Sequence, residues 1–183
     1  NCINRILWLM FIEINNFLNE QSCDEIIKRC SAFIDQNKID VEYNRQGNTV
    51  NTKDHQELKD LDQKIFDRIN LFVTKRLIYS FRLGNSKIKD TGYSFHRYKK
   101  GDQLYTHADG VLALVVNLTN NQNADLIFPR HNKAIKSEKG KLVAFLPHNC
   151  YEHYMNNESN KNRDVLVTWL VDETIECRKV DIG

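Results

Sequence analysis

The feature that most constrains the fold is a series of short apolar runs, separated by polar turns, in the second half of the chain. Each run is rich in β-branched and large apolar residues and is shorter than a typical helix. The runs are VLALVVNLT (111–119), ADLIFP (124–129), KLVAFLP (141–147) and DVLVTWLV (164–171). A succession of short strands of this kind predicts a β-sandwich or jelly roll for this half of the chain.

The segment that precedes these runs, TGYSFHRY (91–98), alternates with a period of two, as a single strand does. The alternation predicts two faces, one with Tyr93, Phe95 and Arg97 and the other with Ser94, His96 and Tyr98. We interpret His96, like His131 further along, as a structural or rim residue.

The first half of the chain predicts a short strand followed by helices. FIEI (11–14) alternates weakly, and the helix after it has a capping box in which Ser22 and Glu25 mark the start. A second helix is predicted where apolar residues recur at helical spacing, at Leu61, Ile65, Ile69, Phe72 and Val73. Between the helices, residues 42–57 have almost no apolar content and predict a loop, of a length often used as a lid or binding segment.

Two helices followed by a run of strands predict an α+β fold, in which N-terminal helices support a jelly-roll core. A chain of 183 residues suits one domain. We therefore expect a single domain over residues 1–183. Residues 1–90 would supply the first strand, the helical support and the lid loop, and residues 91–183 the jelly-roll core.

The composition limits the partners and the compartment. A net charge of +2 is nearly balanced and argues against a nucleic-acid partner. The apolar run 6–12 is too short to span a bilayer, so no membrane partner is expected. The five cysteines are odd in number and show no C-x-x-C spacing, which is typical of free thiols. We therefore expect a reducing compartment and a cytoplasmic location.

A histidine and an aspartate two positions apart, His107 and Asp109, indicate half of a metal site. At this spacing on an extended segment both side chains project from the same face. A third ligand must come from elsewhere: His153, which follows the predicted strand 141–147 and its turn, is preferred, and His148 is the alternative. Two histidines and one carboxylate form the facial triad of non-haem Fe(II) sites. The pair alone is a weak signal, because H-x-D matches also arise by chance.

Several further segments occur in the order found in one known family. The segment 96–109, HRYKKGDQLYTHAD, resembles that family's tyrosine–glycine segment running into H-x-D, and ADLIFP resembles its "GGxLxFP" segment. KGKLVAFLP resembles the strand before the distal histidine, and residues 153–170 resemble that histidine, the cosubstrate arginine and the closing strand. Residues 11–27 resemble the opening strand and helix. Together these segments resemble the 2-oxoglutarate- and Fe(II)-dependent dioxygenases, most closely their prolyl 4-hydroxylase-like branch.

The resemblance implies a double-stranded β-helix that binds Fe(II) through His107, Asp109 and His153. Arg163 would bind the distal carboxylate of the cosubstrate 2-oxoglutarate through its planar guanidinium, and Tyr98 would hydrogen-bond the same molecule. The implied enzyme uses O2, with ascorbate as a further candidate cofactor, and releases succinate and CO2 as it hydroxylates a C–H bond. The implied target is a prolyl residue in a protein or peptide.

The sequence also departs from the family pattern. The strand after H-x-D, LALVVNL, lacks the tyrosine that family members often use for the cosubstrate, and Arg163 stands where many prolyl 4-hydroxylases have a lysine. A lysyl residue, a free amino acid and a nucleic-acid base therefore remain alternative substrates, and a non-catalytic jelly-roll binding module is the alternative from another class. Repair demethylases usually have a second arginine six positions after the first. This chain has Trp169 there, which we interpret as core packing.

Overall fold

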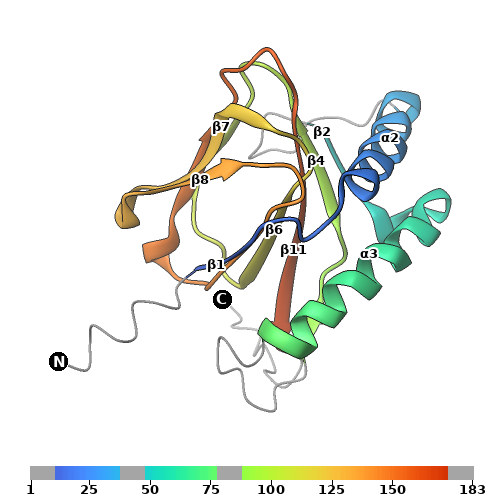
Figure 1. Cartoon of the computed structure of the whole chain (residues 1–183), viewed down its shortest axis with the longest axis horizontal. Coiled ribbons are helices and arrows are strands. Elements are labelled where there is room, and N and C mark those ends of the chain that lie inside the picture. Colours follow the sequence, from blue (N-terminus) through green and yellow to red (C-terminus); the bar gives the residue numbers. More distant parts are fainter. Residues whose placement is uncertain (1–10, 38–47, 78–87, 173–183) are drawn as a thin grey trace, which may run out of the picture.

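The computed structural model describes residues 11–37, 48–77 and 88–172. Within these ranges the chain forms two antiparallel β-sheets that face each other, and two helices pack against the outer face of the larger sheet (Figure 1). The apolar run 6–12 and the predicted lid 42–57 each lie partly outside the described residues.

The larger sheet has the strand order β1-β9-β6-β11-β4-β2, and β3 pairs with β11. Its strands are β1 (Phe11–Ile14), β2 (Asn48–Asn51), β3 (Ile88–Asp90), β4 (Ser94–Tyr98), β6 (Leu112–Asn117), β9 (Leu142–Phe145) and β11 (Arg163–Asp172). The smaller sheet has the order β5-β10-β7-β8. Its strands are β5 (Gln103–His107), β7 (Asn121–Phe128), β8 (Lys133–Ser137) and β10 (His153–Asn156). The chain therefore passes repeatedly from one sheet to the other, which brings distant segments together between them.

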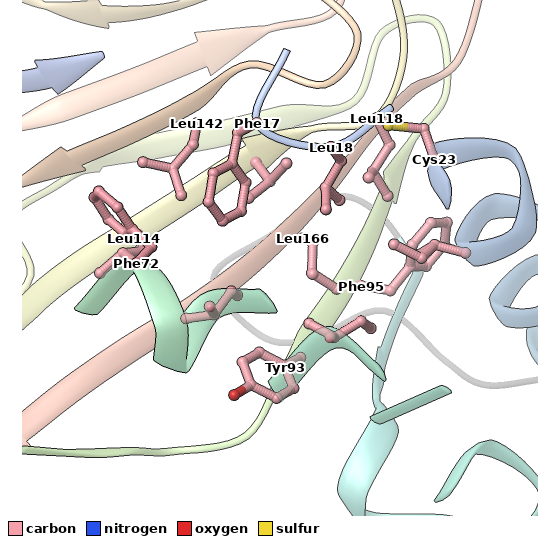
Figure 2. Packing of buried hydrophobic residues seen from close by; sticks show 14 of the residues in the cluster. Phe17, Leu18, Cys23, Phe72, Tyr93, Phe95, Leu114, Leu118, Leu142 and Leu166 are labelled. Atoms are coloured by element: carbon pink, nitrogen blue, oxygen red, sulfur yellow. The ribbon is translucent and has the colours of Figure 1, made fainter. Parts of the chain in front are cut away.

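Alternation along the central strands divides the buried side chains between two cores. On β6, Leu112, Leu114 and Val116 belong to the cluster beneath the helices, whereas Ala113 and Val115 belong to the cluster between the sheets. On and beside β4 the division is the one that the period of two predicts: Tyr93 and Phe95 are in the helix-side cluster, and Tyr98 is in the inter-sheet cluster. Figure 2 shows the helix-side cluster, in which Tyr93, Phe95 and Leu114 lie in one cluster with Phe17, Leu18, Cys23 and Phe72.

Both predicted helices are present, but the first one begins earlier than expected. It is α2 (Glu20–Asn37), and the side-chain oxygen of Asn19 accepts a 2.8 Å hydrogen bond from the Ser22 amide. This is the N-cap geometry, so Asn19 caps the helix and the prediction that Ser22 and Glu25 mark its start is wrong. Ser22 already lies inside the first turn. The prediction placed the cap three residues late because Asn19 has the same capping chemistry as serine.

The second helix is α3 (Lys59–Phe72), and its predicted apolar positions are buried against the larger sheet. A π-helical turn, Val73–Leu77, extends it and buries Val73. The two helices are joined by Arg29 on α2, which donates hydrogen bonds to both carboxylate oxygens of Asp60 and to the carbonyl of Glu57. The helices therefore form a layer that supports the sheet from outside.

The predicted loop 42–57 is not a loop where the structure describes it. Residues 48–51 form β2, which pairs with β4, and 3₁₀ turns follow at Thr52–Asp54 and Gln56–Leu58. The prediction was wrong because it relied on apolar content. β2 is an edge strand held by backbone pairing, and such strands tolerate polar side chains.

Two expectations, one about the cysteines and one about membrane spans, can be compared with the described residues. Cys23, Cys30 and Cys150 carry free thiols, and burial raises the pKa of Cys23 to about 11 and that of Cys30 to about 12. Cys2 and Cys177 lie outside the described ranges. No helix in the described part of the chain is long and apolar enough to cross a membrane.

Candidate active site

The three predicted metal ligands come together at one end of the smaller sheet. His107 ends β5, His153 begins β10, and the two residues are directly opposite each other in the antiparallel pair. Asp109 lies in the turn that leaves β5 for β6. One potential ligand atom from each residue lies within 4.8 Å of those of the other two. The register of two neighbouring strands thus brings residue 153 to a pair 44 residues earlier in the chain.

Backbone carbonyls fix how the two imidazoles face this cluster. Nδ1 of His107 is 2.8 Å from the carbonyl of Tyr105, and Nδ1 of His153 is 2.9 Å from the carbonyl of Tyr151. A carbonyl can only accept, so Nδ1 carries the proton in each ring and Nε2 presents its lone pair. Each Nε2 lies 3.8 Å from one oxygen of Asp109. This donor set fits a divalent metal ion bound by two imidazoles and one carboxylate.

Trp169 contacts the carboxylate of this cluster, which the sequence did not lead us to expect. Its indole Nε1 donates a 3.0 Å hydrogen bond to Oδ1 of Asp109. The interpretation of Trp169 as core packing is therefore incomplete: the ring packs against the inter-sheet core, but its N–H orients a candidate ligand. The alternation of side chains along β11 could have predicted this position, because residues 163, 165, 167 and 169 share one face of the strand.

Arg163 is buried and makes few hydrogen bonds to the described residues. It is 2% exposed, and among those residues Nε has no hydrogen-bond partner, while Nη2 donates a long bond, 3.3 Å, to Oδ1 of Asn117. Burial lowers the pKa of Arg163 to about 10, the direction expected for a cation that has lost solvent without a full set of partners. A buried guanidinium in this state is suited to bind a carboxylate, which accepts two parallel N–H bonds.

One pocket connects Arg163 with the metal cluster. The larger sheet forms its floor, with Arg163, Val165, Val167 and Trp169 from β11, His96 and Tyr98 from β4, and Val115 from β6. The smaller sheet and the turn after β5 contribute Leu104, Leu126 and the three candidate ligands His107, Asp109 and His153. The guanidinium carbon of Arg163 lies 5.8 Å from the centre of the Tyr98 ring. A single small molecule in this pocket could contact Arg163 at one end and a metal ion at the other.

The remaining histidines divide between the pocket and the scaffold. His148, the alternative third ligand, is exposed and caps the 3₁₀ turn Asn149–Tyr151 through Nδ1, so it is not part of the cluster. His131 packs against Tyr151 and Phe11, as a structural residue would. Of the two alternatives expected for His96, structural or rim, burial excludes the rim: it is 1% exposed and lines the pocket floor.

The sequence matches no protein-family model and no curated protein. Solved structures do resemble it. A viral collagen prolyl hydroxylase from Paramecium bursaria Chlorella virus-1, solved as a 2OG complex, is 17% identical with a TM-score of 0.67, over 88% of this chain and 95% of that chain. A Trichoplax adhaerens prolyl hydroxylase, in complex with a hypoxia inducible factor peptide fragment, is 19% identical with a TM-score of 0.69, over 94% and 88%. A Pseudomonas putida prolyl-4-hydroxylase is 14% identical with a TM-score of 0.67, over 93% and 97%.

These likenesses cover most of each chain and establish the fold. The three similar structures are all prolyl hydroxylases, so the chain shares its fold with them.

Proposed function

We propose that this protein is a 2-oxoglutarate- and Fe(II)-dependent dioxygenase that hydroxylates a C–H bond, most specifically that of a prolyl residue in a protein or peptide. One observation carries the proposal: a cluster of two histidines and one aspartate shares a pocket with a buried arginine whose Nε has no hydrogen-bond partner among the described residues. In a fold shared with prolyl hydroxylases, this pair of features matches a metal and a dicarboxylate cosubstrate.

In this proposal the ligands of Fe(II) are His107, Asp109 and His153, and they leave other coordination positions open. Bound Fe(II) and 2-oxoglutarate together activate O2 for insertion into a C–H bond, with release of succinate and CO2. Arg163 holds the distal carboxylate of 2-oxoglutarate, and Tyr98, whose ring lies beneath the guanidinium, positions the same end. Val115, Val165 and Leu126 provide apolar walls that keep water from the reaction.

We also propose that the two sheets form a double-stranded β-helix within one domain. The support comes from strand pairing: β4, β6, β9 and β11 lie in the larger sheet, and β5, β7, β8 and β10 in the smaller one. The first and last strands of this set, β4 and β11, are neighbours. α2 and α3 then serve as supporting helices on the outer face.

A peptide substrate is supported by what surrounds the metal cluster. β5 is an edge strand of the smaller sheet, and Tyr105 on it is 48% exposed, two residues before His107. An exposed edge and an exposed aromatic ring beside the site are suited to contact an extended peptide. The similar Trichoplax structure contains a peptide fragment, which favours the same substrate class.

Turnover of 2-oxoglutarate tests the chemistry. Purified protein supplied with Fe(II), 2-oxoglutarate and O2 should form succinate, and His107→Ala, Asp109→Ala and His153→Ala should each abolish it. His148→Ala is the matched control, because His148 is exposed and outside the cluster; its turnover should equal that of the wild type. Equal turnover in Asp109→Ala and wild type would contradict the proposal.

Peptide mass spectrometry tests the substrate. Proline-containing peptides incubated with the complete mixture should gain the mass of one oxygen atom, and matched peptides with alanine in place of proline should not. Turnover of 2-oxoglutarate without hydroxylation of any prolyl peptide would retain the chemistry and reject the prolyl substrate.

A further inference from the structure

Asn117 is the polar residue that ends β6, and it is buried next to Arg163. The rest of β6, LALVV, is apolar, and Asn117 is 2% exposed. A polar side chain is costly to bury in such surroundings unless it has a hydrogen-bond partner. The position therefore calls for a partner that the apolar strand does not itself supply.

Strand register places Asn117 on the pocket side of the larger sheet. It lies opposite Val165 in the β6–β11 pair. By alternation it shares a face with Ala113 and Val115, which belong to the inter-sheet core. Arg163 is two residues before Val165 on β11, so Asn117 and Arg163 form a diagonal pair on one face. That separation is within reach of a long side chain.

The two side chains are in contact. Nη2 of Arg163 donates a 3.3 Å hydrogen bond to Oδ1 of Asn117. A guanidinium can only donate, so the oxygen of the amide must face Arg163. The backbone of Asn117 is held at both of its polar groups, because its N–H donates to the carbonyl of Lys141 and its carbonyl accepts from the N–H of Gly140. The acceptor for Arg163 thus stands on a fixed base.

The carboxylates whose charge acts on Arg163 are paired with other cations. Burial lowers the pKa of Arg163, and the charges of Asp125 and Asp164 only partly oppose this. Asp164 accepts hydrogen bonds of 2.8 and 3.0 Å from Arg97, and Asp125 accepts one of 2.6 Å from Lys136. Among the described residues, the acceptor that bonds the Arg163 guanidinium is therefore a neutral amide.

The bond to Asn117 leaves donors of Arg163 for a ligand. A guanidinium has five N–H donors in one plane, and a carboxylate accepts two parallel ones. Nε of Arg163 has no hydrogen-bond partner among the described residues. The Tyr98 ring, on the strand at the other side of β11, lies 5.8 Å from the guanidinium carbon. Because the group is planar, fixing one of its nitrogens restricts the direction of the others.

We propose that Asn117 is a positioning residue for the cosubstrate site: its amide oxygen holds the Arg163 guanidinium in the plane that receives the carboxylate of 2-oxoglutarate, and its neutrality leaves the positive charge to the ligand. This inference rests on the proposed function, since Arg163 is the residue proposed to bind 2-oxoglutarate. Asn117 acts through Arg163 and does not touch the cosubstrate. A carboxylate at position 117 would satisfy Arg163 internally and exclude the ligand.

Two substitutions of similar volume test this by calorimetry of 2-oxoglutarate binding to the Mn(II)-loaded protein. Asn117→Leu removes the acceptor and should weaken binding about 2- to 12-fold, which corresponds to the ordering of one long side chain. Asn117→Asp keeps an acceptor at the same place but adds a negative charge. It should weaken binding more than about 100-fold, because the carboxylate of the ligand then meets a like charge.

The controls separate this role from a structural one. Mn(II) affinity should be unchanged in both variants, because Asn117 is outside the metal cluster. In turnover assays both should raise KM for 2-oxoglutarate more than they lower kcat. Without ligand, Asn117→Asp should have a higher Tm than the wild type and Asn117→Leu a lower one, since the first adds a charged partner for Arg163 and the second removes its partner. Asn70→Asp, the same change at an exposed position on α3, should bind 2-oxoglutarate normally.

The outcomes distinguish the two proposals. Wild-type protein that binds 2-oxoglutarate and turns it over, with Asn117→Asp binding equally well, would overturn the role of Asn117 alone. An equal loss of Mn(II) affinity in the variants would also overturn it, because the whole site would then be disturbed. Wild-type protein that neither binds nor turns over 2-oxoglutarate would overturn the proposed function and this inference with it. If Asn117→Leu fails to fold, the nearly isosteric Asn117→Asp decides.

Discussion

Arg163 stands out among single residues because its folded surroundings disfavour its charge. The pKa of Arg163 is lowered to about 10, from an ordinary value near 12.5, because burial removes water and the protein supplies few acceptors. A base whose pKa falls on folding destabilises the folded state at every pH below that value, and the penalty declines as pH rises through about 10. At neutral pH the residue therefore costs stability, which is expected of a group kept for binding.

Replacing this charge should stabilise the protein without ligand. Arg163→Met keeps much of the side-chain volume, and we expect a gain of about 1–4 kcal/mol, by analogy with buried ion pairs replaced by apolar groups. For a chain of this size that is about 2–16 °C in Tm. Thermal unfolding at pH 7 measures it, and the gain should shrink at pH 10.5. A variant less stable than wild type at pH 7 would show that Arg163 already has adequate partners.

Trp169 offers a second prediction at this scale. Trp169→Phe keeps the aromatic ring but removes the N–H that donates to Asp109. Residues that orient metal ligands typically change metal affinity by 10- to 100-fold when mutated, so Mn(II) should bind about that much more weakly. Calorimetry with Mn(II) checks this. Val167→Ala, on the same face of β11 but without a polar contact, serves as the control and should bind Mn(II) normally.

At the scale of elements, the start of α2 can be tested by two alanine substitutions. Asn19→Ala removes the observed cap and should lower the free energy of unfolding by about 0.5–2 kcal/mol. Ser22→Ala removes the residue that the sequence pattern suggested and should change it much less. Chemical denaturation of both variants measures the difference. A larger loss in Ser22→Ala would restore the capping box as the start of the helix.

Elements with a buried face could be predicted from the sequence, and those held mainly by backbone pairing could not. The strands β6, β9 and β11 are runs rich in apolar residues, and the helix α3 has apolar residues at helical spacing, so each can be recognised from its own segment. β2 and β10, NTVN and HYMN, are short and largely polar. Each of these two strands forms because it pairs with a strand that is distant in the sequence. The spacing of residues within one segment does not reveal that pairing.

The same distinction, between what one segment shows and what strand pairing decides, applies to the candidate site. His107 and Asp109 could be paired because two residues apart on a strand means one face. That His153 lies opposite His107 depends on strand register, which the sequence did not predict; His153 was preferred from its place after the predicted strand 141–147 and its turn. The contact of Trp169 with Asp109 was missed because the tryptophan was judged by residue type, as core. Parity with Arg163 along the same strand would have placed it on the pocket face, as parity with Tyr98 did for His96.

At the scale of the whole molecule, the proposed metal and cosubstrate contacts belong to different sheets. The candidate metal ligands lie on β5, β10 and the turn after β5, all on the side of the smaller sheet, whereas Arg163 and Tyr98 are on β11 and β4 of the larger sheet. A dicarboxylate bound to Arg163 at one end and to the metal at the other would connect the two sheets. Ligand binding at two such sites is coupled, and the coupling is reciprocal.

This coupling should be visible as stabilisation that is more than additive. A ligand at a concentration of about 100 times its Kd stabilises the folded state by about 2.7 kcal/mol, or about 5–10 °C for a chain of this length. We expect 2-oxoglutarate to raise Tm by about this much in the presence of Mn(II) and far less in its absence, since the metal supplies one of its two anchors. In Arg163→Met, Mn(II) alone should still stabilise the protein, but 2-oxoglutarate should add nothing. If 2-oxoglutarate raised Tm equally with and without Mn(II), its binding would involve only one sheet and the two candidate sites would be independent.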